Sequence, residues 1–97
     1  MKKNAVVIHS QDCVATAIMP LAAGDKASMF IGSEAKEVTL RNAIPAGHKF
    51  AIRAMARHDE VYKYGESIGR ATQAIELGEH VHVHNVESER GRGDWNQ

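Results

Sequence analysis

The stretch AIPAGHKFA (Ala43–Ala51) is one of four variants of a short pattern that recurs along the chain. Each variant has an apolar residue, a short step of small or polar residues, Gly or His, and then charged and apolar residues. This order predicts a strand, a tight turn and another strand in every copy. The other copies are MPLAAGDKA (Met19–Ala27), AMARHDEVY (Ala54–Tyr62) and AIELGEHVH (Ala74–His82).

The turn position of the pattern holds glycine in three copies, at Gly24, Gly47 and Gly78. Glycine reaches positive φ without a steric penalty from a Cβ atom, which suits a tight corner. His58 occupies this position in the copy Ala54–Tyr62, so we interpret it as a turn residue that tolerates a strained backbone. Repeated corners between short strands predict a mainly β, compact and strongly bent module.

The apolar runs of the chain are short and are bounded by Gly, Pro, Asn or Asp, as is typical of brief strands. In the segment ESIGRATQAIELG, Ile68, Ala71 and Ile75 have helical spacing, so a helical turn is an alternative there. The expected strands are Ala5–His9, Val14–Ile18, Ala27–Ile31, Glu37–Leu40, Lys49–Ala54, Glu60–Tyr62, Ile68–Ala71 and His80–His84.

The composition restricts the classes of function. Twelve basic and twelve acidic residues cancel, which argues against a nucleic-acid binder or a protein of the membrane surface. The single cysteine, Cys13, cannot form an intrachain disulfide and suits a reducing compartment. The apolar run Ala5–Ile8 is too short for a signal peptide, and no stretch approaches a membrane span. We therefore expect a cytoplasmic protein.

The 97 residues suit one small domain, for which we set the bounds 1–86. From Glu87 the segment ESERGRGDWNQ is polar and lacks periodicity, so 87–97 is predicted to be a flexible tail. A domain of this size has little room for an enclosed site, and a partner chain or a homo-oligomer is therefore expected.

The segment EHVHVHN (Glu79–Asn85) holds the most conspicuous polar residues. On a strand, His80, His82 and His84 share one face, while Val81 and Val83 face the core. Two of these imidazoles can converge on one metal ion, whereas three on a straight strand seldom can. A half-exposed strand with polar residues outward is the alternative.

Two further stretches hold candidate site residues. In GHK (Gly47–Lys49), His48 projects from a corner, and Lys49 is a cation able to hold a carboxylate. In YKYGESIG (Tyr62–Gly69), two glycines permit a tight loop with Glu66 at its tip. An exposed turn and a solvated loop are the structural alternatives.

Taken together, these stretches resemble the N-terminal domain of the altronate and galactarate dehydratase family, a module of the SAF type with a β-clip fold. The resemblance is carried by IHSQDCVATAIMPLAAG, GHKFAI and VYKYGESIGRATQAIELGEHVHVHN. It implies a small subunit of a metal-dependent lyase acting on a sugar acid such as altronate or galactarate, inactive alone and completed by a large dehydratase-like subunit. In a relative, sulfolactate sulfo-lyase, the module is a separate small subunit beside a large one. A sulfo-lyase small subunit and a non-catalytic carbohydrate- or carboxylate-binding module are the alternatives.

The resemblance also implies roles for individual residues. We expect His48 and Lys49 to be catalytic and Lys49, Glu66 and Asn85 to bind substrate. The expected metal ligands are His48, His82 and His84, and the expected ion is Fe²⁺, with Mn²⁺ or Zn²⁺ as alternatives. Loss of water from a dihydroxy acid removes a proton next to a carboxylate, and imidazoles and a lysine can provide ligands, proton transfer and carboxylate binding for this reaction.

Overall fold

The computed structural model describes residues 3–63 and 65–87, and in these ranges the chain forms short strands and no helix. The prediction of a mainly β module is therefore confirmed. The strands are β1 (Ala5–Val6), β2 (Val14–Ala17), β3 (Lys26–Ile31), β4 (Glu34–Thr39), β5 (Lys49–Ala51), β6 (Glu60–Lys63), β7 (Glu66–Ala71), β8 (His80–Val81) and β9 (Val86–Glu87).

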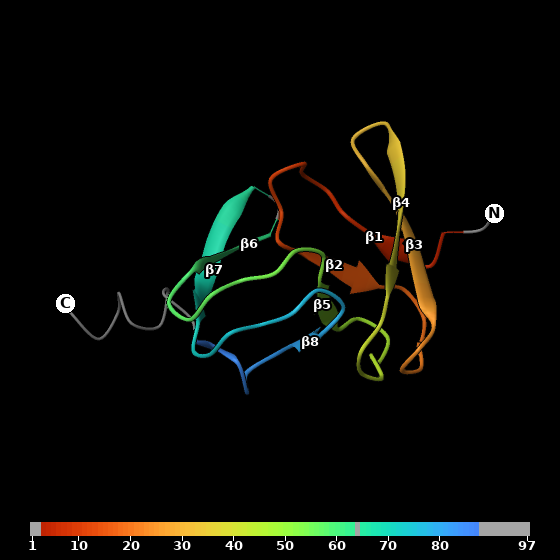
Figure 1. The fold of residues 1–97 in the computed structure, drawn as a ribbon. Helices are drawn as coiled ribbons and strands as arrows, with labels where there is room; N and C mark the ends of the chain where they lie inside the picture. Colours follow the sequence, from red (N-terminus) through yellow and green to blue (C-terminus); the bar gives the residue numbers. More distant parts are fainter. Residues whose placement is uncertain (1–2, 64, 88–97) are drawn as a thin grey trace.

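The strands form three small antiparallel sheets (Figure 1). The central sheet has the order β1-β2-β5-β8, with the β3–β4 hairpin beside one end and the sheet β6-β7-β9 beside the other. Within the central sheet, Lys49 pairs with Thr16 on one side and with Val81 on the other. The start of β5 therefore lies between two strands, next to the histidine-rich segment.

The four copies of the repeat form four similar corners. Gly24, Gly47, His58 and Gly78 all have positive φ, with values from 78° to 90°. The predicted turn glycines and the role of His58 as a turn residue are thus confirmed. The corners also join in pairs through isolated bridges between Leu21 and Ile44 and between Met55 and Ile75.

Three of the corners are closed by a carboxylate. The backbone N–H groups of Ala22, Ala56 and Glu76 donate to the side chains of Asp25, Asp59 and Glu79, at 2.9, 2.8 and 2.9 Å. In the remaining corner, residues 45–48, the first residue is Pro45, which has no N–H to donate. His48 stands in the position of the acid, and its backbone N–H donates to the Pro45 carbonyl at 3.0 Å.

The core consists of two apolar clusters on either side of β5. Phe50 belongs to the cluster that contains Met29 and Ile44, and the next residue, Ala51, belongs to the cluster that contains Val81. Alternate residues of a strand point to opposite faces, so β5 contributes to both clusters. This burial fixes the strand that follows His48.

Two expectations about the histidine-rich segment are wrong. The strand predicted at His80–His84 ends at Val81, and residues 82–85 form a turn. Val83, expected in the core, is 82% exposed. The reason is local, because the Asn85 side chain bonds the backbone of this segment in place of a neighbouring strand.

The remaining differences concern the ends of elements. Ile75 lies in an isolated bridge, so the alternative of a helical turn in this segment is not observed. Glu87 lies in β9 and pairs with Arg70, one residue beyond the expected end of the domain. The rest of the predicted tail, residues 88–97, lies outside the described ranges. No helix long and apolar enough to cross a membrane is present in the described part of the chain.

Candidate metal centre

The corner at 45–48 places His48 beside strand β2, at the start of β5. Gly47 and His48 bond strand β2: the Gly47 N–H donates to the Ala17 carbonyl at 2.8 Å, and the His48 carbonyl accepts from the Ala17 N–H at 2.9 Å. The half-buried imidazole is free of the turn-closing bond that the equivalent acids make in the other corners. It extends instead toward the segment that contains β8.

Asn85 fixes the turn at 82–85 from inside. Its side chain is 0% exposed, accepts the His82 N–H at 3.0 Å and donates to the His80 carbonyl at 2.8 Å. Its backbone N–H also donates to the His82 carbonyl at 3.1 Å. One buried amide therefore links the backbones of His80 and His82.

Three imidazoles meet between this turn and the corner. Nδ1 of His48 lies 3.0 Å from Nε2 of His80, and one ring nitrogen from each of His48, His80 and His82 lies within 4.8 Å of the others. The rings are stacked, with the centroids of His48 and His82 4.5 Å apart. Nitrogens that share one ion at about 2.0–2.1 Å lie roughly 3.0–3.4 Å apart in adjacent positions, and the 3.0 Å separation between the His48 and His80 nitrogens falls in that range.

His84 lies beside this group without joining it. Its ring centroid is 5.4 Å from that of His80, with a tilt of 38°, and its side chain is exposed. His84 was predicted as a ligand and His80 was given less weight, because three imidazoles on a straight strand seldom converge on one ion. The turn after Val81 brings His80 and His82 together instead. A role of His84 as a ligand stays a prediction.

The surroundings favour neutral imidazoles. Loss of solvation lowers the pKa of His80, and the nearby His48, His84, His82 and Lys49 lower it further. Loss of solvation, His48, Lys49 and His84 lower the pKa of His82 in the same way. Because a metal ion binds the neutral ring, these shifts prepare both side chains for ligation at neutral pH.

Lys49 lies next to the histidine group. Its side chain is half-buried and, with His82, lines a mainly apolar hollow of about 190 Å³ whose walls include Ile68, Val81 and Val86. Burial lowers the pKa of Lys49, and the positive charge of Lys63 lowers it further. The geometry thus places Lys49 beside the imidazoles. A catalytic role for His48 and Lys49 stays a prediction.

The other two expected substrate-binding residues lie differently. Glu66 is exposed at the start of β7, pairs with Lys63 across the hairpin, and does not line the hollow beside His82. Asn85 is buried with both polar groups of its side chain bonded to backbone. A direct contact of either residue with substrate stays a prediction, and the geometry favours a positioning role for Asn85.

Two residues of the site were missed or undervalued from the sequence. His80 was treated as the histidine farthest from the motif, although the alternation of histidines is the signal that leads to it. Asn42 accepts the His80 N–H at 2.9 Å, and no pattern in the sequence indicated this contact across 38 residues.

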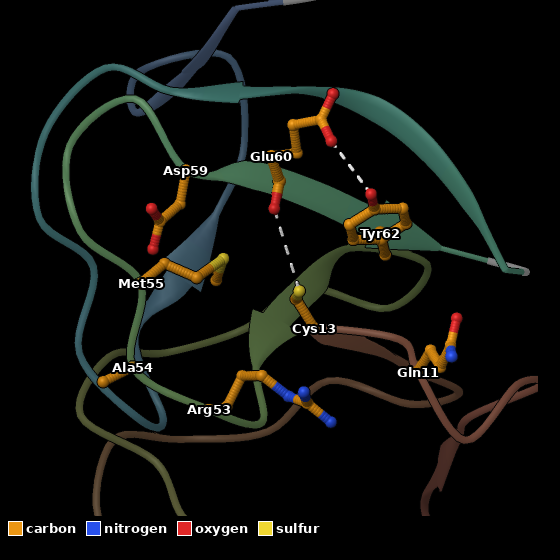
Figure 2. Close-up of a pocket in the computed structure, with 8 residues that line it drawn as sticks. All are labelled: Gln11, Cys13, Arg53, Ala54, Met55, Asp59, Glu60 and Tyr62. Atoms are coloured by element: carbon orange, nitrogen blue, oxygen red, sulfur yellow. Dashed lines mark hydrogen bonds between the residues drawn. The ribbon is translucent and has the colours of Figure 1, made fainter.

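A hollow of about 520 Å³, larger than the one beside His82, lies elsewhere (Figure 2). It is open to solvent over Cys13, whose Sγ atom lies 3.9 Å from the Glu60 carbonyl oxygen. Cys13 itself is buried, and none of the three histidines lines this hollow. Its size therefore does not make it part of the candidate centre.

Comparison with known proteins agrees with the fold. Residues 3–89 match the family model described as the altronate/galactarate dehydratase SAF domain. The chain belongs to this family. The SAF domain match covers all of the described residues, so the corners, the β8 turn and the three imidazoles are all features of one SAF module.

Among the curated relatives of this SAF domain are two kinds of lyase. The chain is 55% identical over 51 residues to a (2R)-sulfolactate sulfo-lyase subunit alpha of Chromohalobacter salexigens, covering 53% of this chain and 54% of the relative. It is 35% identical over 86 residues to the altronate dehydratase of Bacillus subtilis and 42% identical over 81 residues to that of Escherichia coli. These matches cover 89% and 84% of this chain and 16% of each dehydratase. The matched part is thus about half of the sulfo-lyase subunit and a small part of the dehydratases.

Proposed function

We propose that this SAF domain is the small subunit of a metal-dependent lyase that acts on a hydroxylated carboxylic acid, with a sugar acid as the leading candidate. The observation that carries the proposal is the convergence of His48, His80 and His82 beside Lys49 on one open face. Relatives named altronate dehydratase and sulfolactate sulfo-lyase subunit alpha support the class of reaction.

The donor set fits the metal that the family resemblance implies. Three neutral ring nitrogens suit Fe²⁺ or Zn²⁺, whereas Mn²⁺ more often takes oxygen ligands. No carboxylate takes part in the group among residues 3–63 and 65–87. We therefore propose His48, His80 and His82 as the ligands that this chain contributes and Fe²⁺ as the ion, with Zn²⁺ as the alternative. A bound ion would supply Lewis acidity for the elimination.

Lys49 has the position and the chemistry to act on the carboxylate end of a substrate. As an ammonium it would hold the carboxylate beside the imidazoles. Its lowered pKa also raises the fraction of neutral amine, which is the form that removes a proton. The chain by itself has a shallow, open site, so a large subunit is proposed to supply the remaining groups and to exclude water.

A second candidate, a sulfo-lyase small subunit acting on sulfolactate, rests on one specific observation. The relatives named as separate subunits are both sulfolactate sulfo-lyase subunits alpha, at 55% identity over 51 residues and 43% over 53 residues. Removal of a proton next to a carboxylate would precede loss of either water or sulfite, so the same residues serve both reactions.

Reconstitution tests both candidates. The chain is purified under anaerobic conditions, titrated with Fe²⁺ and Zn²⁺ by calorimetry, and then combined with the large lyase chain from the same genome. We expect no turnover by the isolated chain and, from the combined chains, turnover of altronate or galactarate, or of (2R)-sulfolactate for the second candidate.

Three outcomes would count against the proposal. Turnover by the isolated chain would refute the role of a subunit. A chain that binds neither ion would refute the metal site. A large chain that is equally active with and without this protein would refute its contribution to catalysis.

A further inference from the structure

An exposed apolar residue stands at the tip of the turn that holds the candidate ligands. Val83 is 82% exposed, the largest exposure among the large apolar residues of the described ranges. The turn is nevertheless fixed at its ends, because the N–H groups of Asn85 and Val86 both donate to the His82 carbonyl at 3.1 Å. The Asn85 carbonyl accepts the Thr72 N–H at 2.9 Å. A bonded turn therefore presents this apolar side chain to solvent.

The surface next to Val83 is apolar and hollowed. Val83 shares the hollow of about 190 Å³ with Ile68, Val81 and Val86. Lys49 and His82 line the same hollow, so an apolar surface continues directly into the candidate metal centre. A surface that joins an exposed apolar anchor to a site of function is typical of a docking interface.

The charges on this face indicate what it docks. Lys49 and a metal bound by three neutral imidazoles would leave the face strongly cationic, and the histidine group includes no carboxylate in the part of the chain that the structure describes. An occupant that places carboxylates next to the site would balance this charge. Residues matched in the altronate dehydratases make up 16% of each protein, so in those relatives the module is joined to much more polypeptide.

We propose that Val83 and the hollow beside it form the docking surface for the large lyase chain, which would insert an apolar side chain into the hollow and place carboxylates near Lys49 and the imidazoles. This inference rests on the proposed function, because it takes the partner to be the large subunit. Beyond the proposed function, the inference gives the location of the interface on this chain and names Val83 as the apolar residue that anchors it.

A second apolar hollow offers a matched control. It measures about 210 Å³, is lined by Val6 and Phe30, and includes none of the three histidines. Val6 is 41% exposed in β1, while Phe30 is already covered in part by the ammonium of Lys3, 4.5 Å from the ring centroid. Replacing valine by serine in either hollow removes the same two methyl groups.

The experiment compares Val83→Ser with Val6→Ser. Affinity of each variant for the large lyase chain of the same genome is measured by surface plasmon resonance, and Fe²⁺ titration checks that the histidine site is intact. We expect Val83→Ser to weaken the complex by about tenfold, as for an interface anchor, and Val6→Ser to change it less than twofold.

The failures are distinguishable. If the native chains form no complex, the proposed function fails and this inference with it. If they form a complex that Val83→Ser leaves unchanged, the docking surface is refuted while the subunit role stands. A loss of affinity confined to Val6→Ser would assign the interface to the other hollow.

Discussion

The corner at 45–48 and the corner at 22–25 have the same backbone and opposite uses of their last side chain. In the corner at 22–25, Asp25 accepts the N–H of Ala22 at 2.9 Å and closes the turn. In the corner at 45–48, Pro45 offers no N–H, and His48 directs its ring toward His80. The candidate site therefore lies at the corner that lacks the stabilising hydrogen bond of the other three.

Proline explains why this corner can have a histidine where the other corners have an acid. A carboxylate at position 48 would find no N–H donor at position 45, so an imidazole at position 48 leaves no buried group unpaired. The fixed φ of proline also restricts the turn in place of the missing bond. The fold thus keeps the corner while the side chain becomes available for chemistry.

The largest expected effect tests the turn that completes the site. Asn85→Ala removes two hydrogen bonds of a buried amide, to His82 and His80, and should lower the free energy of unfolding by about 2–3 kcal/mol. Asp25→Ala removes one exposed bond and should cost about 1 kcal/mol. Urea unfolding of the two variants measures the difference, and equal losses would show that Asn85 is no more than another turn cap.

The second prediction separates the two histidines found in corners. His48→Ala should weaken Fe²⁺ or Zn²⁺ binding at least about tenfold, which corresponds to about 1.4 kcal/mol, because one of three ligands is lost. His58→Gly should leave metal binding unchanged, since His58 is a turn residue with φ of 78° and glycine adopts positive φ without a steric penalty. Calorimetric titration measures the metal affinity of both variants.

A related prediction compares His80 with His84. The same titration should show a larger loss of metal affinity for His80→Ala than for His84→Ala, and the reverse order would restore His84 as the ligand.

The third prediction concerns two substitutions that would restore the turn-closing hydrogen bond in the corner at 45–48. His48→Asp alone gains no cap, because Pro45 has no N–H, whereas the double variant Pro45→Ala/His48→Asp regains the arrangement of Ala22 and Asp25. We expect a favourable coupling of about 1 kcal/mol between the two substitutions. Thermal or urea unfolding of the two single variants, the double variant and the native chain gives this value. A coupling of zero would mean that the corner at 45–48 is not equivalent to the others.

The smallest expected effect concerns pH. The folded state lowers the pKa of His80 below 6.5, so the unfolded chain binds more protons in this range and stability falls as the pH decreases below about 6.5. Loss of solvation is the main cause of this lower pKa, and the charges of His48, His84, His82 and Lys49 act in the same direction. Melting temperatures at pH 7.5 and 5.5 should differ more for the native chain than for His80→Gln. An identical difference would place the pH dependence elsewhere.

Much of the fold could be predicted because it is local. A glycine or His58 at each turn position, and short apolar runs between turns, specify bent strands from neighbouring residues alone. The candidate site was only partly predictable. His48, Lys49 and His82 are recognisable as residues, but their convergence depends on the pairing of Lys49 with Val81, which sets two distant segments side by side.

The alternation of histidines did not predict the structure of its own segment. Period two predicts a strand from His80 to His84 and a buried Val83, and the chain instead turns after Val81. A local pattern cannot reveal that the Asn85 amide finds its partners within the same segment, although Asn is a residue that forms such turns. The assumption of a straight strand also underlies the prediction of His84, rather than His80, as a metal ligand.

The class of the fold, the four corners and the types of residue available for chemistry follow from local sequence, because they depend on turn geometry and alternation over a few neighbours. Which imidazoles meet, the burial of Asn85 and the exposure of Val83 depend instead on how distant segments pack. These outcomes depend on hydrogen bonds such as that of His80 with Asn42, 38 residues away. Contacts of this kind form only when β5 and β8 pair, since that pairing brings the corner at 45–48 to the turn at 82–85.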